Sequence, residues 1–388
     1  MDFDVIVVGA GLVGASFALA LKNAGLRIAV VETRIPPTAI DTAGWDSRIY
    51  AISPGSVEFL RGCGAWDRLD TARYCPVEDM QIFGDDAVSE LDFGAYAAGL
   101  RELAVITENR ELQRVLWESL NCAPHVEIIA PAECRELVID NEAAVLTLAD
   151  GRTLRARLLV GADGAESWVR QQAGIEVRPR PYRQTAVVAN FTTALPHRGV
   201  ATQWFQRDGI LALLPLPGER VSIVWSTAEE RANQLLQLSA DALAAEVTAA
   251  SHEKFGVLQL LTPAAAFPLQ IQRVQRLVVP RVALIGDAAH SVHPLAGQGV
   301  NLGFRDARQL ARVLTDRGAQ SDCGDYPLLR RYERARKEDI ATMQLTTHSL
   351  QRLFNNDDAQ LARLRNLGLR LVNRQPRLKN LLVRHAVG

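Results

Sequence analysis

Three glycine-rich segments contain the residue types that could hold a phosphate-bearing or ring-shaped ligand. The first is Gly9-Ala10-Gly11-Leu12-Val13-Gly14, the second is Gly161-Ala162-Asp163-Gly164, and the third spans residues 286–303 and reads GDAAHSVHPLAGQGVNLG. Glycine lets the backbone come close to a ligand, and main-chain N–H groups at a helix start attract anions. These segments therefore indicate binding by backbone groups, and no convincing Ser-His-Asp triad or carboxylate pair accompanies them.

The first segment stands in the context that a dinucleotide site requires. The apolar run DVIVV at residues 4–8 precedes it, and a helical pattern at 16–22 follows. A second apolar run at 27–31 is closed by Glu32. A strand, a G-x-G-x-x-G turn, a helix and an acid about 20 residues further on form the nucleotide-binding βαβ unit.

Each glycine of this unit has its own predicted task. Gly9 permits the tight turn, Gly11 lets the backbone approach a pyrophosphate, and Gly14 lets the helix and strand pack closely. Glu32 would accept hydrogen bonds from the ribose hydroxyls of an adenosine. A βαβ unit without a nucleotide is the alternative, and the complete context favours the dinucleotide.

The third segment favours FAD over NAD. It follows the strand-forming residues 281–285, and a helical pattern begins at Asn301. A plain NAD dehydrogenase would not need such a loop, and the chain has no second G-x-G-x-x-G. His290 and His293 form H-x-x-H, but further ligands are lacking nearby, so we expect no metal site.

The remaining patterns predict the elements that position these segments. Residues 107–120 and 229–250 read as helices, and 136–158 as a β-meander. We predict an α/β fold with a Rossmann-like FAD-binding domain (parallel sheet and β-meander), an inserted antiparallel-sheet substrate domain and C-terminal helices. The predicted division assigns 1–76, 97–180 and 272–325 to the FAD-binding domain, 77–96 and 181–271 to the substrate domain, and 326–388 to the C-terminal region.

Composition narrows the class of protein. The chain has 388 residues, a formal net charge of -1 and five cysteines without zinc-site spacing. These values give no case for nucleic-acid binding and suggest reduced thiols in a cytoplasmic protein. The apolar run at 5–21 follows acidic residues and is expected to be neither an export signal nor a membrane span. From residue 359 onward the chain has no acid, and this basic segment could contact anionic lipid or simply cover a domain.

Together the motifs resemble the group A flavoprotein aromatic monooxygenases of the p-hydroxybenzoate hydroxylase fold, and more narrowly the FAD-dependent ubiquinone-biosynthesis hydroxylases. The similarity covers nearly the whole chain and is weakest over 184–267. It rests on the glycine motif with Glu32 and on DSRIYAIS, ENRELQRVL, LLVGADGAESWVR, HPLAGQGVNLGFRDA and NLGLRLVNRQP.

The resemblance implies a role for each site residue. Gly9, Gly11, Gly14 and Glu32 would bind the ADP half of FAD, and Arg48 and Arg110 the pyrophosphate or ribityl chain. Asp163 and Gly164 match a fingerprint for FAD and NAD(P)H, and Gly286-Asp287 would meet the ribityl hydroxyls. Gly299, Val300 and Asn301 would face the isoalloxazine ring, and His293, Pro294 and Gly297 would form a loop facing flavin and substrate, with no acid–base group assigned.

The resemblance also implies an activity. FAD, reduced by NAD(P)H, would react with O2 through a C4a-hydroperoxyflavin and hydroxylate the ring of a polyprenylated phenol in ubiquinone biosynthesis. A multi-enzyme complex and a peripheral membrane contact would fit such a substrate. Other flavoenzymes of this fold are alternatives: a hydroxylase of soluble aromatics, a prenyl reductase or a halogenase, although the W-x-W-x-I-P signature of halogenases is absent. A non-catalytic nucleotide-fold escort protein is a further alternative, against which the loop at 297–301 argues.

Overall fold

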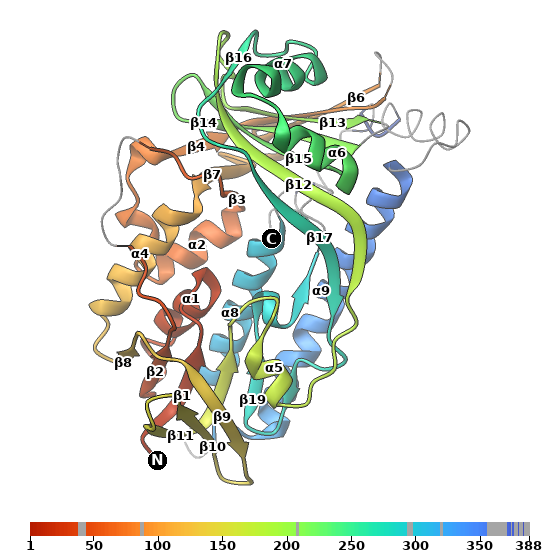
Figure 1. Ribbon diagram of the computed structural model, residues 1–388. Helices are drawn as coiled ribbons and strands as arrows, with labels where there is room; N and C mark the ends of the chain where they lie inside the picture. The colour runs from red at the N-terminus through yellow and green to blue at the C-terminus, as the bar shows by residue number, and fades with distance from the viewer. Residues whose placement is uncertain are drawn as a thin grey trace.

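The computed structural model describes residues 1–37, 44–85, 89–206, 209–292, 298–318 and 321–354, together with positions 371–373, 375, 379 and 383. Two large sheets organise the chain. In Figure 1 one sheet lies in the lower half, near the N-terminus, and the other crosses the upper half. The long helix α9 (Tyr326–Phe354) runs along the right-hand side.

The lower sheet has eight strands. In chain order they are β1 (Phe3–Val8), β2 (Ile28–Val31), β8 (Val126–Ile129), β9 (Cys134–Ile139), β10 (Ala144–Leu148), β11 (Thr153–Gly161), β18 (Val278–Val279) and β19 (Val282–Leu284). Their spatial order is β18-β19-β11-β1-β2-β8, and β10 and then β9 extend from β11. β1 pairs in parallel with β2 and β11, and β9, β10 and β11 form an antiparallel meander. The predicted Rossmann-like sheet and meander are confirmed.

Helices cover this sheet and explain its strand sequences. Val5, Ile6 and Val7 of β1 have 0% exposure, which accounts for the apolar run without polar alternation. The helix α1 (Leu12–Ala20) contacts both α4 (Asn109–Asn121) and α8 (Gln298–Thr315). Two further helices of this half are α2 (Pro54–Gly62) and α5 (Trp168–Gln172).

The upper sheet has nine strands. They are β5 (Asp79–Phe83), β6 (Glu90–Gly94), β12 (Arg180–Thr193), β13 (Val200–Gln206), β14 (Gly209–Leu216), β15 (Arg220–Ala228), β16 (Leu258–Leu260), β17 (Ala265–Arg273) and β20 (His290–Ser291). Their spatial order is β20-β17-β12-β15-β14-β13-β5-β6, with β16 paired to β12. All pairs are antiparallel except β13 with β5. The predicted antiparallel sheet is thus confirmed, with one parallel pair added.

Several helix predictions need correction, and the first is the pattern at 16–22, which is the helix α1 (Leu12–Ala20). The helix expected over 229–250 is two helices, α6 (Glu229–Gln237) and α7 (Ala240–Ala250). Leu238 interrupts it because its backbone is extended (ψ 148°) and the Ser239 side chain caps the second helix. The helix expected from residue 107 begins at Asn109, because the preceding residues belong to a strand.

That strand, β7 (Ala104–Glu108), lies in a small third sheet between β3 (Ile49–Ile52) and β4 (Tyr74–Val77). β4 and β7 contact β14 of the upper sheet, while β3 contacts α8, so the small sheet joins the two halves. The shorter turns are α3 (Ala95–Ala98), η1 (Trp66–Arg68), η2 (Thr71–Arg73) and η3 (Gly286–Ala288). Among the described residues, none of the helices is both long and apolar enough to cross a membrane. The division into domains at the predicted residue numbers stays a prediction.

Candidate flavin and substrate site

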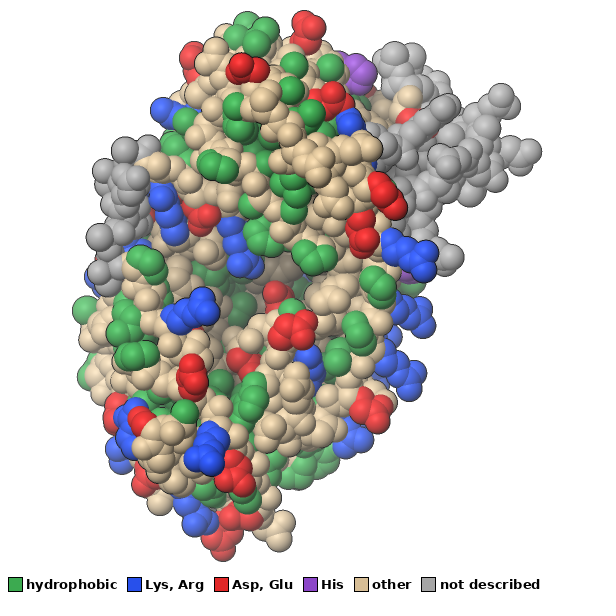
Figure 2. Space-filling view, in the orientation of Figure 1, with side chains coloured by type: hydrophobic (Ala, Val, Ile, Leu, Met, Phe, Trp, Pro, Cys, Tyr) green, Lys and Arg blue, Asp and Glu red, His purple; other side chains and the backbone are tan. Residues whose placement is uncertain are grey.

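A cavity of about 920 Å³ lies between the lower and upper sheets. This size falls in the range of small-molecule sites. Figure 2 shows the molecule hollowed at mid-height, between the two halves. Backbone and polar groups line one part of the wall, and apolar side chains line the other. The two parts are built from different sheets.

The start of α1 forms the phosphate-facing part of the wall. Gly11 stands at the N-cap, with neither a side-chain cap nor an acid in the first turn. A Cβ on Gly11 would meet nothing within 4 Å, whereas a Cβ on Gly14 would lie 2.0 Å from the Gly9 carbonyl oxygen. Gly14 therefore serves close packing, and Gly11 leaves an open cradle of N–H groups that fits a pyrophosphate.

Glu32 lies at the end of β2, beside this cradle. Its Oε2 accepts a hydrogen bond from the Ala10 N–H at 2.7 Å, and its Oε1 accepts one from the Arg34 N–H at 3.1 Å. Gln113 of α4 also closes on the turn, because its Nε2 donates to the Ala10 carbonyl at 2.6 Å and the residue lines the cavity. Glu32 thus stands next to the glycine turn, where the predicted ribose contact requires it.

Asp163 and Gly164 follow β11 at the same sheet edge. Gly164 lines the cavity. The Asp163 carboxylate is engaged locally: it accepts from the Ser167 hydroxyl at 2.5 Å and from the Val169 N–H at 3.0 Å. Burial raises the pKa of Asp163, and these hydrogen bonds oppose the increase. The side chain therefore fixes the start of α5, and it is Gly164 that faces the cavity.

A buried arginine joins this second motif to the third. Arg170 Nη2 donates to the Ala165 carbonyl at 2.8 Å, and its Nη1 donates to the Ala288 carbonyl at 3.0 Å. The parallel pairing of β11 with β19 places Gly161 opposite Leu284. The two glycine-rich segments, far apart in the chain, thus meet at one edge of the cavity.

Asp287 forms part of the cavity wall. The residue is solvent-accessible and accepts no hydrogen bond from any described residue. Even so, burial raises the pKa of Asp287, opposed by the charges of His290 and Arg48. A cavity-lining carboxylate to which no described residue donates fits the hydroxyl groups of a ribityl chain.

The start of α8 forms the opposite part of this polar wall. Gly299 and Val300 line the cavity, and a Cβ on Gly299 would meet nothing within 4 Å. Asn301 is fully buried: its Oδ1 accepts from the Ser53 N–H at 2.9 Å, and its Nδ2 donates to the Ala51 carbonyl at 2.8 Å. Asn301 thus ties α8 to β3 and α2, so that the helix start points its N–H groups at the cavity.

The helix α8 begins at Gln298, three residues before the predicted start at Asn301. The loop residues predicted to face flavin and substrate, His293, Pro294 and Gly297, lie outside the described residues.

Sequence reasoning missed the group that holds the third motif in place. Asp306 of α8 is completely buried, and its Oδ2 accepts from the Gly286 N–H at 3.0 Å and pairs with His290 Nε2 at 2.5 Å. Its Oδ1 pairs with Arg336 Nε of α9 at 2.6 Å. Burial opposes ionisation, but the charges of His290 and Arg336 outweigh it and lower the pKa of Asp306. His290 is therefore a structural partner, and the described residues contain no cluster of His, Cys, Asp and Glu that could hold a metal.

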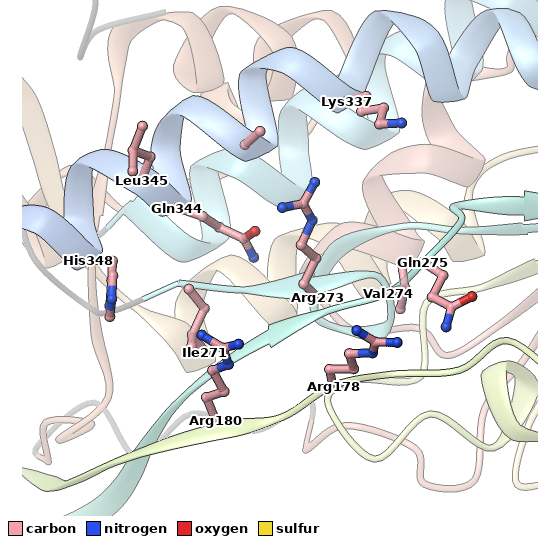
Figure 3. A pocket seen from close by; sticks show the side chains of 11 residues that line it. Arg178, Arg180, Ile271, Arg273, Val274, Gln275, Lys337, Gln344, Leu345 and His348 are labelled. Carbon is pink, nitrogen blue, oxygen red and sulfur yellow. The ribbon is translucent and has the colours of Figure 1, made fainter.

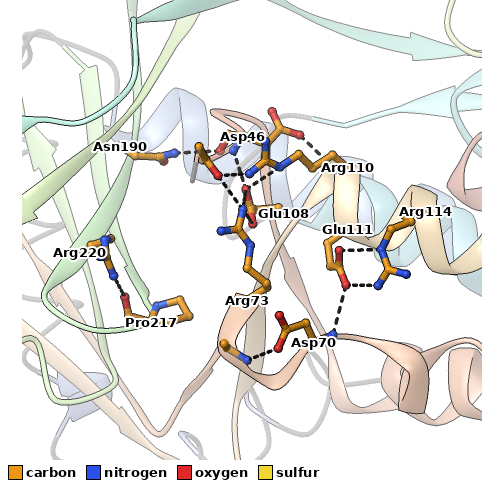
Figure 4. A network of polar contacts seen from close by, with 12 residues as sticks. Asp46, Asp70, Arg73, Glu108, Arg110, Glu111, Arg114, Asn190, Pro217 and Arg220 are labelled. Atoms are coloured by element: carbon orange, nitrogen blue, oxygen red, sulfur yellow. Dashed lines mark hydrogen bonds and ion pairs between the residues drawn. The ribbon is translucent and has the colours of Figure 1, made fainter. Parts of the chain in front are cut away.

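A second network, drawn in Figure 4, fixes the loop that carries Arg48. Glu108 is fully buried and pairs with Arg73 Nη2 at 2.7 Å and with Arg110 Nε at 3.1 Å. Its Oε1 also accepts from the Asp46 N–H at 2.5 Å. The Asp46 carbonyl accepts from Asn190 Nδ2 at 2.8 Å, which links the loop to the upper sheet. The motif ENRELQRVL begins at Glu108, but it indicated neither the role of Glu108 nor its pairing with Arg73, because their partners come from distant segments.

Arg48 and Arg110 differ in their placement. The Arg48 guanidinium lies 5.5 Å from the Tyr50 ring centre and 6.0 Å from that of Phe267, and the residue lines the cavity. Arg110 also donates to the Gly44 carbonyl, and it is not part of the cavity wall. Arg48 can therefore meet a ligand directly, whereas Arg110 is held by Glu108 and stabilises the loop.

The rest of the cavity wall is mostly apolar. Its wall comes from the inner faces of the upper and small sheets, with additions from α9 and the C-terminal segment. The large apolar side chains are Val77, Met80, Ile82, Leu91, Phe93, Leu103, Ile106, Phe205, Ile210, Leu214, Val224, Val292, Met343 and Val383. Such a wall suits a large hydrocarbon group and excludes water.

Comparisons with known proteins agree with this geometry. A family model described as an FAD binding domain matches residues 2–346. The ubiquinone hydroxylase UbiL of Rhodospirillum rubrum is 38% identical over 386 residues, which cover 99% of this chain and 89% of that protein. The 3-demethoxyubiquinol 3-hydroxylase of Escherichia coli is 35% identical, covering 99% of this chain and 98% of that protein.

A solved structure matches the fold. PqsL of Pseudomonas aeruginosa, in complex with 2-aminobenzoylacetate, has a TM-score of 0.77 and 24% identity, and the match covers 95% of this chain and 99% of PqsL. At that identity the likeness shows the fold alone. The family match and the full-length relatives show more: the chain belongs to the FAD-binding domain family, among the FAD-dependent ubiquinone-biosynthesis hydroxylases.

Proposed function

We propose that this protein hydroxylates the aromatic ring of a polyprenylated phenol in ubiquinone biosynthesis, with NAD(P)H as electron donor and O2 as oxygen source. One observation carries the proposal: a single cavity joins a polar cradle for FAD to a long apolar wall. The curated relatives named for ubiquinone hydroxylation align over nearly the whole chain, including both walls.

The residues divide the work between holding the cofactor and holding the substrate. Gly11 and the start of α1 would bind the pyrophosphate, Glu32 the ribose and Asp287 the ribityl hydroxyls. The start of α8, at Gly299 and Val300, would direct N–H groups at the flavin ring. When bound, FAD supplies the acceptance of hydride and the activation of oxygen.

The apolar wall would orient the substrate and keep water away. Side chains such as Met80 and Phe205 can bury part of a prenyl chain, which leaves the phenol ring toward the polar wall. No described side chain stands as an acid or base for the ring itself. Positioning and water exclusion are thus the protein's contributions.

The hydrophobic prenyl chain of the substrate suggests where in the cell the enzyme works. We propose a cytoplasmic enzyme that works at the membrane surface and in contact with other enzymes of the pathway. The basic segment from residue 359 could provide the contact; most of it lies outside the described residues.

Oxygen-18 gas and a deletion strain test the function. The purified protein, loaded with FAD and given NAD(P)H and a prenylated phenol, is expected to place one oxygen-18 atom in the product. A deletion in a ubiquinone producer is expected to accumulate a prenylated precursor lacking one hydroxyl. Consumption of NAD(P)H without labelled product would indicate a reductase, and an unchanged quinone profile would remove the pathway from the proposal.

A further inference from the structure

A second cavity lies outside the flavin and substrate site. It has a volume of about 570 Å³ and lies between α9 and the strands β12 and β17. Figure 3 shows its floor formed by two neighbouring strand segments and its roof by the helix. The basic side chains in its wall are Arg178, Arg180, Arg273, Lys337 and His348, and none of the described residues in the wall is acidic. We call it the basic pocket.

The charges of the basic pocket lack counter-charges. Within the described part of the chain, the side chains of Arg178, Arg180, Arg273 and Lys337 form no ion pair or hydrogen bond. The carboxylate of Glu176 lies nearby, but it accepts a hydrogen bond from Gln275. This contrasts with the arginines of the flavin half, such as Arg110 and Arg336, which are paired with carboxylates.

A histidine adds a second, independent sign of a missing partner. The Nδ1 atom of His348 is buried and has no hydrogen-bond partner among the described residues. Its ring packs against Tyr182 at 5.9 Å between centres. Buried polar atoms normally have partners, so an unpartnered nitrogen in the wall of a cavity points to a ligand.

Guanidinium groups from two adjacent strands suit one kind of ligand best. Like charges held together repel one another, and a group with two negative charges offsets this cost. Arginine forks match the oxygens of a phosphate and bind it in pairs of charge-assisted hydrogen bonds. The volume leaves room for more than a bare phosphate ion.

The basic pocket shares a wall with the flavin cavity. Gln344 Nε2 of α9 donates to the Gln272 carbonyl at 2.8 Å and to the Ser291 carbonyl at 3.2 Å. Ser291 lines the flavin cavity, as do Met343 and Thr347 on the neighbouring face of α9. A ligand in the basic pocket would therefore lie one helix away from the reaction.

We propose that the basic pocket binds the phosphate group of a ligand. This goes beyond the proposed function and does not depend on it, because binding can be measured without turnover. Two sources of this chemistry fit the surroundings: the phosphates of the reduced pyridine dinucleotide, and the headgroup of an anionic lipid.

The test uses inorganic pyrophosphate as the probe and titration calorimetry of the FAD-loaded protein, so that the flavin's own phosphate site is filled. Arg180→Ala and Arg273→Ala are each expected to weaken binding about tenfold. Arg135→Ala is the matched control, since Arg135 is an exposed arginine on β9 in the lower sheet that forms no ion pair with a described residue. Retained FAD in each variant shows that the fold is intact.

Competition then identifies the source. NADPH that displaces pyrophosphate from the wild-type protein, but is bound weakly by Arg273→Ala, assigns the pocket to the dinucleotide. Vesicles of phosphatidylglycerol that displace it, when phosphatidylcholine vesicles do not, assign it to lipid. The proposal is overturned if the wild-type protein binds no pyrophosphate, or if Arg135→Ala weakens binding as much as the two pocket variants do.

Discussion

Replacing Asp287 with alanine is expected to weaken FAD binding without destabilising the folded protein. The Asp287 carboxylate lies in the cavity wall and accepts no hydrogen bond from a described residue. Burial raises its pKa, because it disfavours the charged form of the carboxyl group. Asp287→Ala therefore removes no hydrogen bond from a described residue in the FAD-free protein, and the melting temperature is expected to stay the same or rise.

FAD binding, in contrast to the melting temperature, is expected to weaken. A hydrogen bond to a charged group contributes about 1.5–3 kcal/mol, which corresponds to about 10-fold to 150-fold in a dissociation constant. If the ribityl hydroxyls donate to Asp287, Asp287→Ala should weaken FAD binding within that range. Asp287→Asn keeps the shape of the side chain without its charge, and its FAD affinity should lie between those of the wild type and Asp287→Ala.

The assay is a titration of the FAD-free protein with FAD, followed by flavin fluorescence, with thermal unfolding of the same sample. Asp150→Ala serves as the control, because Asp150 lies in an exposed turn paired with Arg152. Unchanged FAD affinity in Asp287→Ala would refute the assigned role. A large fall in the melting temperature of the FAD-free variant would refute the view that this carboxylate makes no stabilising contact.

Other changes test the pH dependence of Asp287, the buried carboxylate of Asp306, the glycine turn at the start of α1 and the loop that Glu108 holds. Because the folded pKa of Asp287 is raised, its contribution to stability without FAD is full below the unfolded pKa and is lost as the pH rises through the folded value. FAD affinity, measured by the same titration, should rise over that window, and Asp287→Asn should flatten the rise. Asp306→Asn removes the fully buried anion that pairs with both His290 and Arg336, leaves Arg336 only the partly exposed Asp339, and should lower the free energy of unfolding by about 3–5 kcal/mol, seen in denaturant unfolding. Gly11→Ala should keep the circular dichroism of the fold but lose FAD, whereas Gly14→Ala should lose both, since its Cβ would lie 2.0 Å from a backbone oxygen. Glu108→Gln should leave two arginines poorly paired, lower the melting temperature and weaken FAD binding, and equal FAD affinity would show that the loop is held without it.

Local patterns predicted the parts of the site that are local in sequence. The glycine turn, the strands beside it and the cap of α2 at Ser53 depend on neighbouring residues, so their residue types suffice to predict them. The β-meander was predictable for the same reason, because its turns follow Asp140 and Asp150.

Long-range partners could not be predicted in this way. Glu108 meets Arg73 and Asp46, which are 35 and 62 positions away, and no spacing rule connects them. Arg110, which was predicted as a phosphate ligand, is likewise engaged with Glu108 and Gly44, a pairing that its sequence position did not indicate. The apolar wall of the cavity could not be predicted either. Each strand contributes only a few of its side chains, and the fold alone brings them together.

The strand order of the lower sheet has a consequence for biosynthesis. β1 emerges from the ribosome first, yet one of its two neighbours is β11 (Thr153–Gly161), and β11 in turn waits for β19 (Val282–Leu284). Until those strands are made, β1 and β2 have an open, apolar edge that can pair with other chains.

Cofactor capture must come later still, because Asp287 and the start of α8 follow β19 in the chain. A nascent chain truncated before β19 should therefore bind no FAD, although it contains the whole glycine turn. Flavin binding is thus expected only after β19 and α8 have been made, and the half-made chain is the stage at which a chaperone would be needed most.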